Sequence, residues 1–344
     1  MKNVISVTEK PARLCDSAPF TIDYSQPLQL QRTRQRTKDA IAFSALRPSP
    51  VVPRALAAPA ASVVTTEPLP LQHSATIKTL PSILNSETTD LNEAELALLQ
   101  AKQHRLRHST IRASFGKSKL DRAVKATLVF GQEEAGTAVC ISPHGVVLTC
   151  SHCVAESAEE LEREKMKWLL FASGQIVHAE CVAWDPKRDL ALLRIIAAQP
   201  HLQVPDSSTS VPVANSSSFP FVSTAESTPC LRAPLICIGH PGSEDLEATE
   251  PGTKTDYDVL HVSTGLYRGC APGQDLQDNS EIGALKHDAW TYWGHSGAPL
   301  VAQTTGLLIG MHSSWDEHTG MRRGVPLEAI QKFLKKHAAI LDFK

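Results

Sequence analysis

The sequence lacks most of the features that mark membrane, secreted or nucleic-acid-binding proteins. Its formal net charge is only −2 over 344 residues, which argues against nucleic acid as a partner held by a global electrostatic field. No apolar run reaches the roughly 18 residues that span a bilayer. The first 30 residues lack the charged start, apolar centre and small-residue cleavage site of a secretory signal. We therefore expect no membrane contact and an intracellular location, either cytoplasmic or nuclear.

Cysteine and glycine are both sparse. Eight cysteines are too few for a disulfide-stapled scaffold, and without a secretory signal reduced thiols are the default. The first glycine is Gly116, and residues 1–88 hold ten of the 23 prolines but no tryptophan. Such a segment cannot bury enough apolar area to offset its ordering entropy. Residues 1–88 are therefore predicted to be a largely disordered, proline-rich leader.

A change of pattern after this leader indicates where the folded part begins. Residues 89–122 predict a basic helical lead-in, which Asp90 would cap while Glu93 reaches back to the backbone. From residue 123 onward, short apolar runs lie between turn residues, as is typical of strands. The predicted strands are 124–130, 137–141, 146–149, 168–172, 176–184 and 190–196, then 235–239, 257–267, 282–290, 299–302, 307–312 and 322–325.

The grouping of these strands predicts the fold class. Residues 123–197 form the first set of six, and residues 231–344 hold the second set with a closing helix at 326–337. Residues 198–230 lie between the sets and carry eight serines, five prolines and no Lys or Arg, so we expect a linker there. Two sets of about six short strands predict an all-β protein of two six-stranded antiparallel β-barrels with a C-terminal helix.

A serine between two glycines is the strongest candidate for chemistry. Ser296 lies in the run Trp293-Gly-His-Ser-Gly-Ala-Pro-Leu300. A serine hydroxyl needs a base to become a nucleophile, and the carbonyl that it attacks needs hydrogen-bond donors for the oxygen that becomes negative. Because Gly294 has no Cβ, the backbone can turn so that the N–H groups of Gly294 and Ser296 converge. An ordinary turn explains the motif equally well until a base and an acid are found.

Both partners lie upstream at the ends of apolar runs. His152 follows Leu148-Thr-Cys-Ser151, and Asp189 precedes Leu190-Ala-Leu-Leu193. With these motifs, residues 124–337 resemble trypsin-like serine peptidases of the chymotrypsin fold. The run Ser142-Pro-His-Gly-Val-Val-Leu-Thr-Cys-Ser-His152 is more narrowly similar to the HtrA-like branch. From the short stretch after the closing helix we expect a member without the PDZ domain that many HtrA-like proteins append.

The resemblance implies a role for each candidate residue. His152, Asp189 and Ser296 would form a catalytic triad, and the N–H groups of Gly294 and Ser296 an oxyanion hole. The substrate-binding residues implied are Trp290, Ser313, Ser314 and Trp315. Ser313 to Trp315 would pair with the backbone of a peptide or protein substrate, and Ser314 is also a candidate support for Asp189. Trp290 stands where the family has the residue at the base of the specificity pocket, which favours a small or apolar substrate side chain.

Departures from the family pattern limit this comparison. His295 stands where trypsin-like digestive enzymes have an aspartate that pairs with a newly formed N-terminus, so that activation route is not expected. Ala298 replaces the usual second glycine. Cys150 and Cys153 form a C-x-x-C, but no second ligand pair of metal-binding spacing follows. We predict neither a metal nor another cofactor, and packing beside His152 as the role of both sulfurs.

Two functions remain open. The first is a serine endopeptidase that cleaves peptide bonds through an acyl-enzyme intermediate. The second is a catalytically silent chymotrypsin-fold protein that binds peptides or acts as a scaffold. The complete set of triad residues favours the enzyme, whereas the sequence leaves the oligomeric state open.

Overall fold

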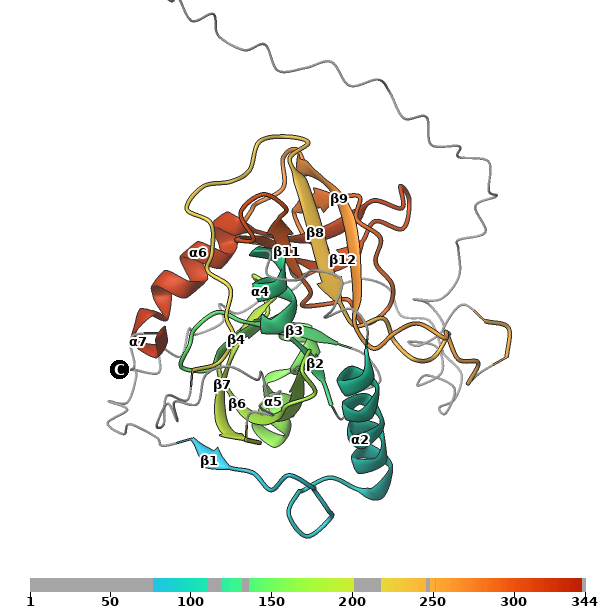
Figure 1. Cartoon of the computed structure of the whole chain (residues 1–344). Coiled ribbons are helices and arrows are strands. Elements are labelled where there is room, and N and C mark those ends of the chain that lie inside the picture. The colour runs from blue at the N-terminus through green and yellow to red at the C-terminus, as the bar shows by residue number, and fades with distance from the viewer. Residues whose placement is uncertain are drawn as a thin grey trace, which may run out of the picture. The chain divides into compact units, whose positions relative to one another are not determined.

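A computed structural model of the chain describes residues 77–109, 119–131, 136–200, 218–245, 248–250 and 252–341. All of them lie in one of the chain's two units, Phe43–Lys344. Most of the predicted leader, residues 1–76, and the middle of the predicted linker, residues 201–217, lie outside the described residues. Figure 1 shows the described elements in chain order.

The first barrel is formed by six antiparallel strands. They are β2 (Thr127–Phe130), β3 (Thr137–Cys140), β4 (Val146–Thr149), β5 (Met166–Phe171), β6 (Ile176–Asp185) and β7 (Leu190–Ala198). Their order is β7-β4-β3-β2-β5-β6, and pairing between β6 and β7 closes the barrel. The short strand β1 (Lys78–Thr79) adds to β7 in parallel.

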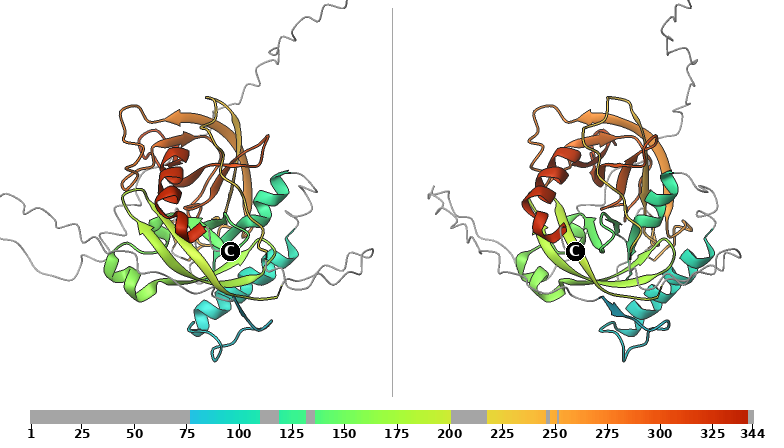
Figure 2. Two further views of the ribbon diagram at one scale, coloured as in Figure 1. Left: turned by 90° about the vertical axis from the view of Figure 1, so that its left-hand side faces the viewer. Right: turned by 60° about the vertical axis from the view of Figure 1, so that its left-hand side comes forward.

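The second barrel has the same number of strands. They are β8 (Pro234–Gly239), β9 (His261–Cys270), β10 (Leu285–His287), β11 (Pro299–Ala302), β12 (Leu308–Trp315) and β13 (Arg322–Pro326). The closed order is β10-β13-β12-β11-β8-β9, with every pairing antiparallel. Figure 2 shows this barrel in orange and red beside the green strands of the first. The predicted fold class of two six-stranded antiparallel barrels is confirmed.

Burial on both faces explains the unbroken apolar runs in strands of the first barrel such as β4. Successive side chains of a strand point to opposite faces. In β4, Val147 packs within the first barrel, whereas Val146 and Leu148 belong to an apolar cluster that extends to Ile236 and Ile238 of the second barrel. Because neither face of such a strand meets solvent, the sequence shows an unbroken apolar run instead of alternation.

Helices cover the barrels and connect them to the ends of the described chain. The 3₁₀ turn η1 (Ser151–Cys153) follows β4, and α5 (Ala158–Glu164) follows it. α6 (Leu327–Lys336) packs on β12 and β13. After α6, α7 (Ala338–Leu341) reaches the first barrel, where the Ile340 carbonyl accepts a bond from Arg194 Nη2 at 3.4 Å. Among the described helices, none is long and apolar enough to cross a bilayer.

The lead-in helix begins two residues later than predicted. α2 (Glu93–His108) has Asn92 as its N-cap, and the Asn92 and Glu95 side chains bond reciprocally to the backbone. The predicted cap, Asp90, instead accepts a 2.8 Å hydrogen bond from Trp168 Nε1 of β5. The prediction that Asp90 caps this helix is therefore wrong, because a side chain of the barrel competes for its carboxylate.

A second correction concerns the start of the first barrel. Residues 124–126 were expected to begin a strand, but they end the helix α4 (Lys119–Ala126), and β2 begins only at Thr127. Ala123, Val124 and Ala126 are buried on one side of this amphipathic turn. The apolar residues before Thr127 therefore follow helical spacing, which a run of three does not distinguish from a strand.

The structure predicts a stability effect for the closing helix. Phe333 of α6 is fully buried in the apolar cluster shared by the two barrels. Phe333→Ala should lower the free energy of unfolding by about 3–5 kcal/mol, since it leaves a cavity in a close-packed region. Chemical denaturation measures this change. Lys332 is exposed on the same helix, so Lys332→Ala should change the free energy of unfolding by no more than about 0.5 kcal/mol. Equal denaturation midpoints for the two variants would contradict the buried packing of Phe333.

Candidate active site

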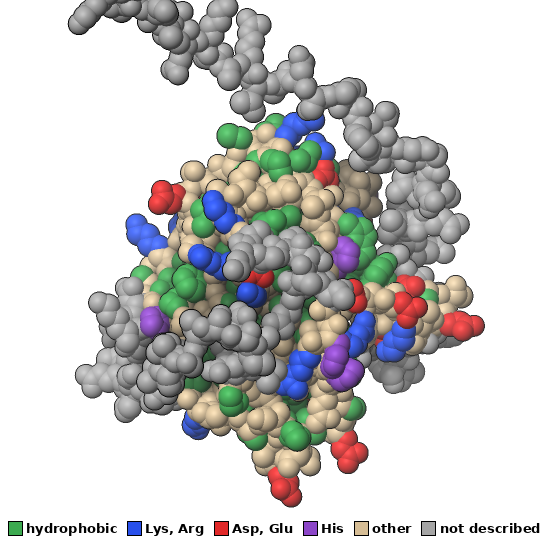
Figure 3. All heavy atoms as spheres, viewed as in Figure 1, with side chains coloured by type: hydrophobic (Ala, Val, Ile, Leu, Met, Phe, Trp, Pro, Cys, Tyr) green, Lys and Arg blue, Asp and Glu red, His purple; other side chains and the backbone are tan. Residues whose placement is uncertain are grey.

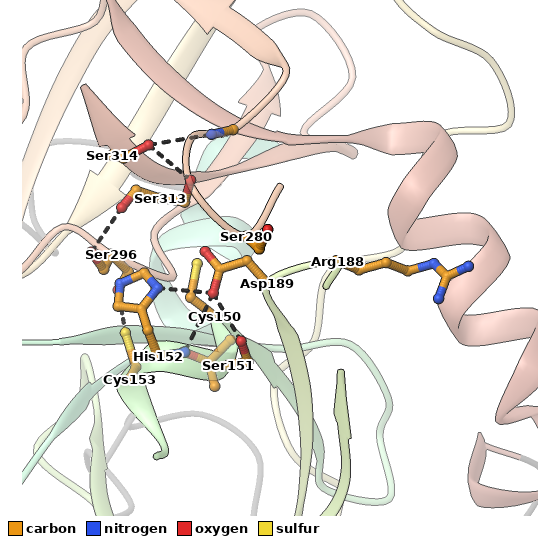
Figure 4. Close-up of polar contacts among 12 residues, drawn as sticks. Cys150, Ser151, His152, Cys153, Arg188, Asp189, Ser280, Ser296, Ser313 and Ser314 are labelled. Atoms are coloured by element: carbon orange, nitrogen blue, oxygen red, sulfur yellow. Dashed lines mark hydrogen bonds and ion pairs between the residues drawn. The ribbon is translucent and has the colours of Figure 1, made fainter. Parts of the chain in front are cut away.

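His152 and Asp189 meet at one edge of the first barrel. His152 lies in η1 directly after β4, and Asp189 lies directly before β7, the strand that pairs with β4. Their atoms Nδ1 and Oδ1 are 2.8 Å apart, as Figure 4 shows. A carboxylate only accepts, so Nδ1 carries the proton and Nε2 is left with a free lone pair. The pair is thus arranged as a base held by an acid.

Asp189 is fixed from several sides. It is 5% exposed and has a positive φ of 54°, a conformation that Asp tolerates better than most residues. Besides His152 Nδ1, its Oδ1 accepts from Ser151 Oγ at 3.0 Å and from the His152 N–H at 3.3 Å. Three donors on one oxygen hold the carboxylate in place.

Ser151 is a supporting residue that the sequence prediction missed. The candidate support was Ser314, but its hydroxyl accepts from the Gly283 N–H at 3.3 Å and lies 3.3 Å from Ser313 Oγ (Figure 4). Within the described part of the chain, no hydrogen bond joins Ser314 to Asp189. The only signal for Ser151 in the sequence was its place next to His152, which does not show that its side chain points toward the acid.

The surroundings raise the pKa of His152. Desolvation acts in the opposite direction and is the largest single influence, but the Asp189 carboxylate and the neighbouring Cys153 sulfur together outweigh it. The result is a pKa well above the ordinary histidine value. The imidazole side chain is 46% exposed, so solvent still reaches the ring and exchanges protons with it.

Ser296 lies on a turn of the second barrel that contacts the first. Its carbonyl accepts from Thr137 N–H at 2.9 Å and from Cys153 Sγ at 3.4 Å. These bonds hold the turn against Cys153, the residue that follows His152. Ser296 Oγ donates to the Ser313 carbonyl at 3.1 Å (Figure 4), and in the described part of the chain no hydrogen bond joins this hydroxyl to His152.

Within residues 294–298 of this turn, two N–H groups have no acceptor among the described residues: those of Gly294 and Ser296. The intervening and following groups are satisfied, because His295 N–H donates to Tyr292, Gly297 N–H to His312 and Ala298 N–H to His295. Gly294 has φ +94°, which glycine adopts without strain. The predicted oxyanion-hole donors are therefore the two that the turn leaves unused.

Gly297 shows why the residue after the serine is glycine. It has φ +83°, and a Cβ there would lie 1.9 Å from the Thr137 carbonyl oxygen and 2.5 Å from Thr149 Oγ1. Any side chain would push the turn away from the first barrel. The close approach of the Ser296 turn to β3 and β4 thus depends on this glycine.

The predicted substrate-binding residues fall into two places. Ser313 and Trp315 lie with Ser314 at the end of β12, where the Trp315 ring meets the Trp293 ring edge-on at 4.5 Å. Trp290 packs edge-on against Tyr257 at 5.2 Å and stacks with Tyr292 at 6.3 Å. The sequence prediction did not include this aromatic group, because Tyr257 is distant in the chain.

One further group has ligand atoms close enough together for a metal. The ligand atoms of Cys150, His152 and Asp189 lie within 4.8 Å of one another among the described residues. Burial and the nearby Asp189 carboxylate raise the pKa of the Cys150 thiol well above its usual value. The direct hydrogen bond accounts for the closeness of His152 and Asp189 without a metal.

The sequence matches a known family over the segment that holds this site. The model of the trypsin-like peptidase domain matches residues 136–311, slightly more than half of the chain. This chain belongs to the trypsin-like peptidase family. The match includes His152, Asp189 and Ser296, and the predicted resemblance to trypsin-like peptidases is confirmed at the level of the family.

Solved structures with a similar arrangement include two bacterial proteins. A serine endoprotease of Yersinia pestis is 21% identical with a TM-score of 0.43, and the similarity covers 63% of this chain and 64% of that chain. The inactive form of Rv3671c of Mycobacterium tuberculosis, a serine-to-alanine mutant, is 18% identical with a TM-score of 0.44, covering 66% and 93%. This chain thus spans about two thirds of the length of the Yersinia protein.

The geometry predicts that Asp189 controls the protonation of His152. In Asp189→Asn the negative charge is lost, so the pKa of His152 should fall from its raised value. NMR titration of the imidazole protons measures it. Asp288→Asn, in the second barrel and paired with Arg268, should leave the pKa of His152 unchanged. A His152 pKa that is the same in wild type and Asp189→Asn would contradict the charge coupling.

Proposed function

We propose that this chain is a serine endopeptidase that uses Ser296 as nucleophile, His152 as base and Asp189 as the acid that orients it. The observation that carries the proposal is the 2.8 Å bond between His152 Nδ1 and Asp189 Oδ1, which lies beside the turn of Ser296. Proteins and peptides are the substrate class that the family indicates.

Catalysis would begin with a rotation of the serine side chain. Ser296 Oγ donates to the Ser313 carbonyl, a bond worth about 0.5–1.5 kcal/mol. That cost is small beside a catalytic barrier, so a bound substrate can turn the hydroxyl toward His152 Nε2. As Oγ attacks the substrate carbonyl, Nε2 takes its proton and Asp189 stabilises the imidazolium.

The remaining steps use groups already in place. The oxygen of the attacked carbonyl becomes negative, and the free N–H groups of Gly294 and Ser296 would donate to it, an effect of about 3 kcal/mol per donor. The C–N bond then breaks, His152 returns the proton to the leaving amine, and an ester remains on Ser296. A water molecule, deprotonated by His152, hydrolyses this acyl-enzyme and restores the serine.

The raised pKa of His152 sets the direction of the pH dependence. Only the neutral imidazole can accept the proton, so kcat/KM should rise with pH through the pKa of His152 in the free enzyme. Because Asp189 and Cys153 raise that pKa, the acid limb should lie above the position set by an ordinary histidine.

The pairing of β12 supports an extended substrate. Residues 308–311 pair with β11 and residues 310–315 with β13. Among the described residues, no strand pairs with Ser313 to Trp315 on the side away from β13. A peptide that added there as a strand would lie beside Ser296.

A catalytically silent peptide-binding protein is the second candidate. The bond of Ser296 Oγ to Ser313 instead of His152 is the observation that favours it, since a resting serine that never reaches the base cannot react. The open edge of β12 would serve such a protein equally well.

Labelling by a fluorophosphonate probe distinguishes the two candidates. The wild-type chain should be labelled covalently because His152 activates Ser296, whereas Ser296→Ala should not be labelled. Ser313→Ala keeps the carbonyl that Ser296 contacts and serves as a matched serine control that should still be labelled. Absence of labelling in folded wild-type protein over a range of pH would favour the silent protein.

Turnover of Asp189→Asn tests the orienting role. The variant should lose about 10⁴-fold in kcat, because Asn stabilises the wrong imidazole tautomer. The rate of peptide hydrolysis measures this loss, and Asp288→Asn is again the control for loss of one surface carboxylate. Near-normal turnover of Asp189→Asn would remove Asp189 from the mechanism.

A further inference from the structure

A pair of buried histidines lies inside the second barrel behind Ser296. His287 of β10 is 0% exposed and His312 of β12 is 2% exposed. His287 Nε2 and His312 Nδ1 are 3.0 Å apart, and their rings meet edge-on at 5.2 Å. A peptidase needs no such pair for the chemistry of its triad, so the pair calls for another explanation.

Backbone contacts place His312 directly against the nucleophile turn. Its carbonyl accepts from Gly297 N–H at 2.9 Å, and its N–H donates to the Ala298 carbonyl at 2.9 Å. The next residue, Ser313, provides the carbonyl that Ser296 Oγ contacts. The His312 side chain therefore branches from the backbone that supports the reacting serine.

The position of one proton follows from the burial of His287. Its Nδ1 is buried without a hydrogen-bond partner among the described residues. A buried N–H without an acceptor is rare and costly, so the proton of His287 belongs on Nε2, where His312 Nδ1 accepts it. Neutral His312 then carries its own proton on Nε2. That N–H makes no hydrogen bond within the described part of the chain.

The charges around the pair favour an anion. Burial, and secondarily the neighbouring histidines and Arg322, keep the pKa of His312 well below its usual value, and burial with Arg322 lowers the pKa of His287 to about 3. Arg322 is thus a permanent cation near the pair, and its Nη2 donates to the Thr291 carbonyl at 3.4 Å. The Asp288 carboxylate acts to raise the pKa of His287, in the opposite direction to burial, and it accepts a 2.6 Å hydrogen bond from Arg268 Nε.

We propose that His312 is a specificity-determining residue whose Nε2–H donates to an acidic side chain on the substrate residue whose carbonyl Ser296 attacks. His287 is its positioning residue, because its own N–H fixes the tautomer of His312. The proposal rests on the proposed peptidase function and specifies its substrate class.

The chemistry favours a carboxylate over other side chains. The His312 Nε2–H has no hydrogen bond within the described residues, so an arriving acceptor adds one, and a charged acceptor gives the stronger bond. The positive potential of Arg322 adds to this preference, whereas an amide gains nothing from it. At the substrate residue whose carbonyl is attacked, the proposal therefore predicts an acidic side chain, whereas Trp290 alone predicts a small or apolar one.

Peptide hydrolysis tests this preference in the full chain. Fluorogenic peptides that differ only at the residue whose carbonyl is attacked would carry Glu, Gln or Leu there. Wild type should cleave the Glu peptide with the highest kcat/KM. In His312→Val the ratio of Glu to Leu cleavage should fall by about 10- to 100-fold, as expected for the loss of a hydrogen bond to a charged group.

Two variants of His287 separate positioning from mere packing. His287→Phe fills the space without a donor and should lower the Glu to Leu ratio, whereas His287→Gln supplies an amide N–H and should restore much of it. His178→Phe removes a partly buried histidine that stacks on Trp168 in the first barrel, and should leave the ratio unchanged.

Fluorophosphonate labelling separates a failure of the specificity proposal from a failure of the proposed peptidase function. Labelled enzyme that prefers the Gln or Leu peptide, or a His312→Val variant with an unchanged ratio, would overturn the assignment of His312 while the peptidase stands. Folded wild type that is neither labelled nor active on any peptide would overturn the peptidase itself, and the specificity with it.

Discussion

Thr137 joins the turn of Ser296 to the first barrel, and the candidate site depends on this joint. Its N–H donates to the Ser296 carbonyl at 2.9 Å, and its hydroxyl donates to the Gly294 carbonyl at 2.9 Å while accepting from His240 N–H at 2.9 Å. Its own carbonyl lies where a Cβ of Gly297 would be. His152 and Asp189 belong to the first barrel and Ser296 to the second, so their separation is set at this contact and not within either barrel.

The site shows how burial acts in opposite directions on histidines a short distance apart. His152 has a buried carboxylate at 2.8 Å, and its pKa is raised although desolvation opposes the rise. His295 has no such partner, and burial with the nearby His261 lowers its pKa to about 3. One aspartate therefore decides which of these imidazoles has a raised pKa. Burial lowers the pKa of His287, His295 and His312, which favours their neutral, hydrogen-bonding form, the form that the proposed recognition by His312 requires.

The sequence predicted the features that depend on neighbouring residues, and it did not predict those that depend on contacts between residues far apart in the chain. Most strands were predictable because their apolar runs are buried and bounded by turn residues, although β9 (His261–Cys270) and β10 (Leu285–His287) differ from the predicted strands 257–267 and 282–290. The His–Asp–Ser order followed from motifs at strand ends. The N-cap of α2 was not predictable, because Asp90-x-x-Glu93 and Asn92-x-x-Glu95 fit the same capping pattern. Trp168 of a distant strand donates a hydrogen bond to the Asp90 carboxylate. Ser151 and the His287–His312 pair were missed for the same reason, since 38 and 25 residues separate the partners of those hydrogen bonds.

The hydrogen bond of Ser296 to Ser313 fits a site in which substrate binding turns the serine hydroxyl toward His152. Its hydroxyl contacts Ser313, the residue at the open edge of β12 where a peptide strand would add. A strand that paired there would bring its carbonyl toward the free Gly294 and Ser296 N–H groups and would compete for the same backbone. Release of the serine toward His152 would then follow from occupancy of the edge. In the proposed mechanism, substrate binding and activation of the nucleophile are one event, and the weak Ser296–Ser313 bond holds the hydroxyl until a substrate strand competes for it.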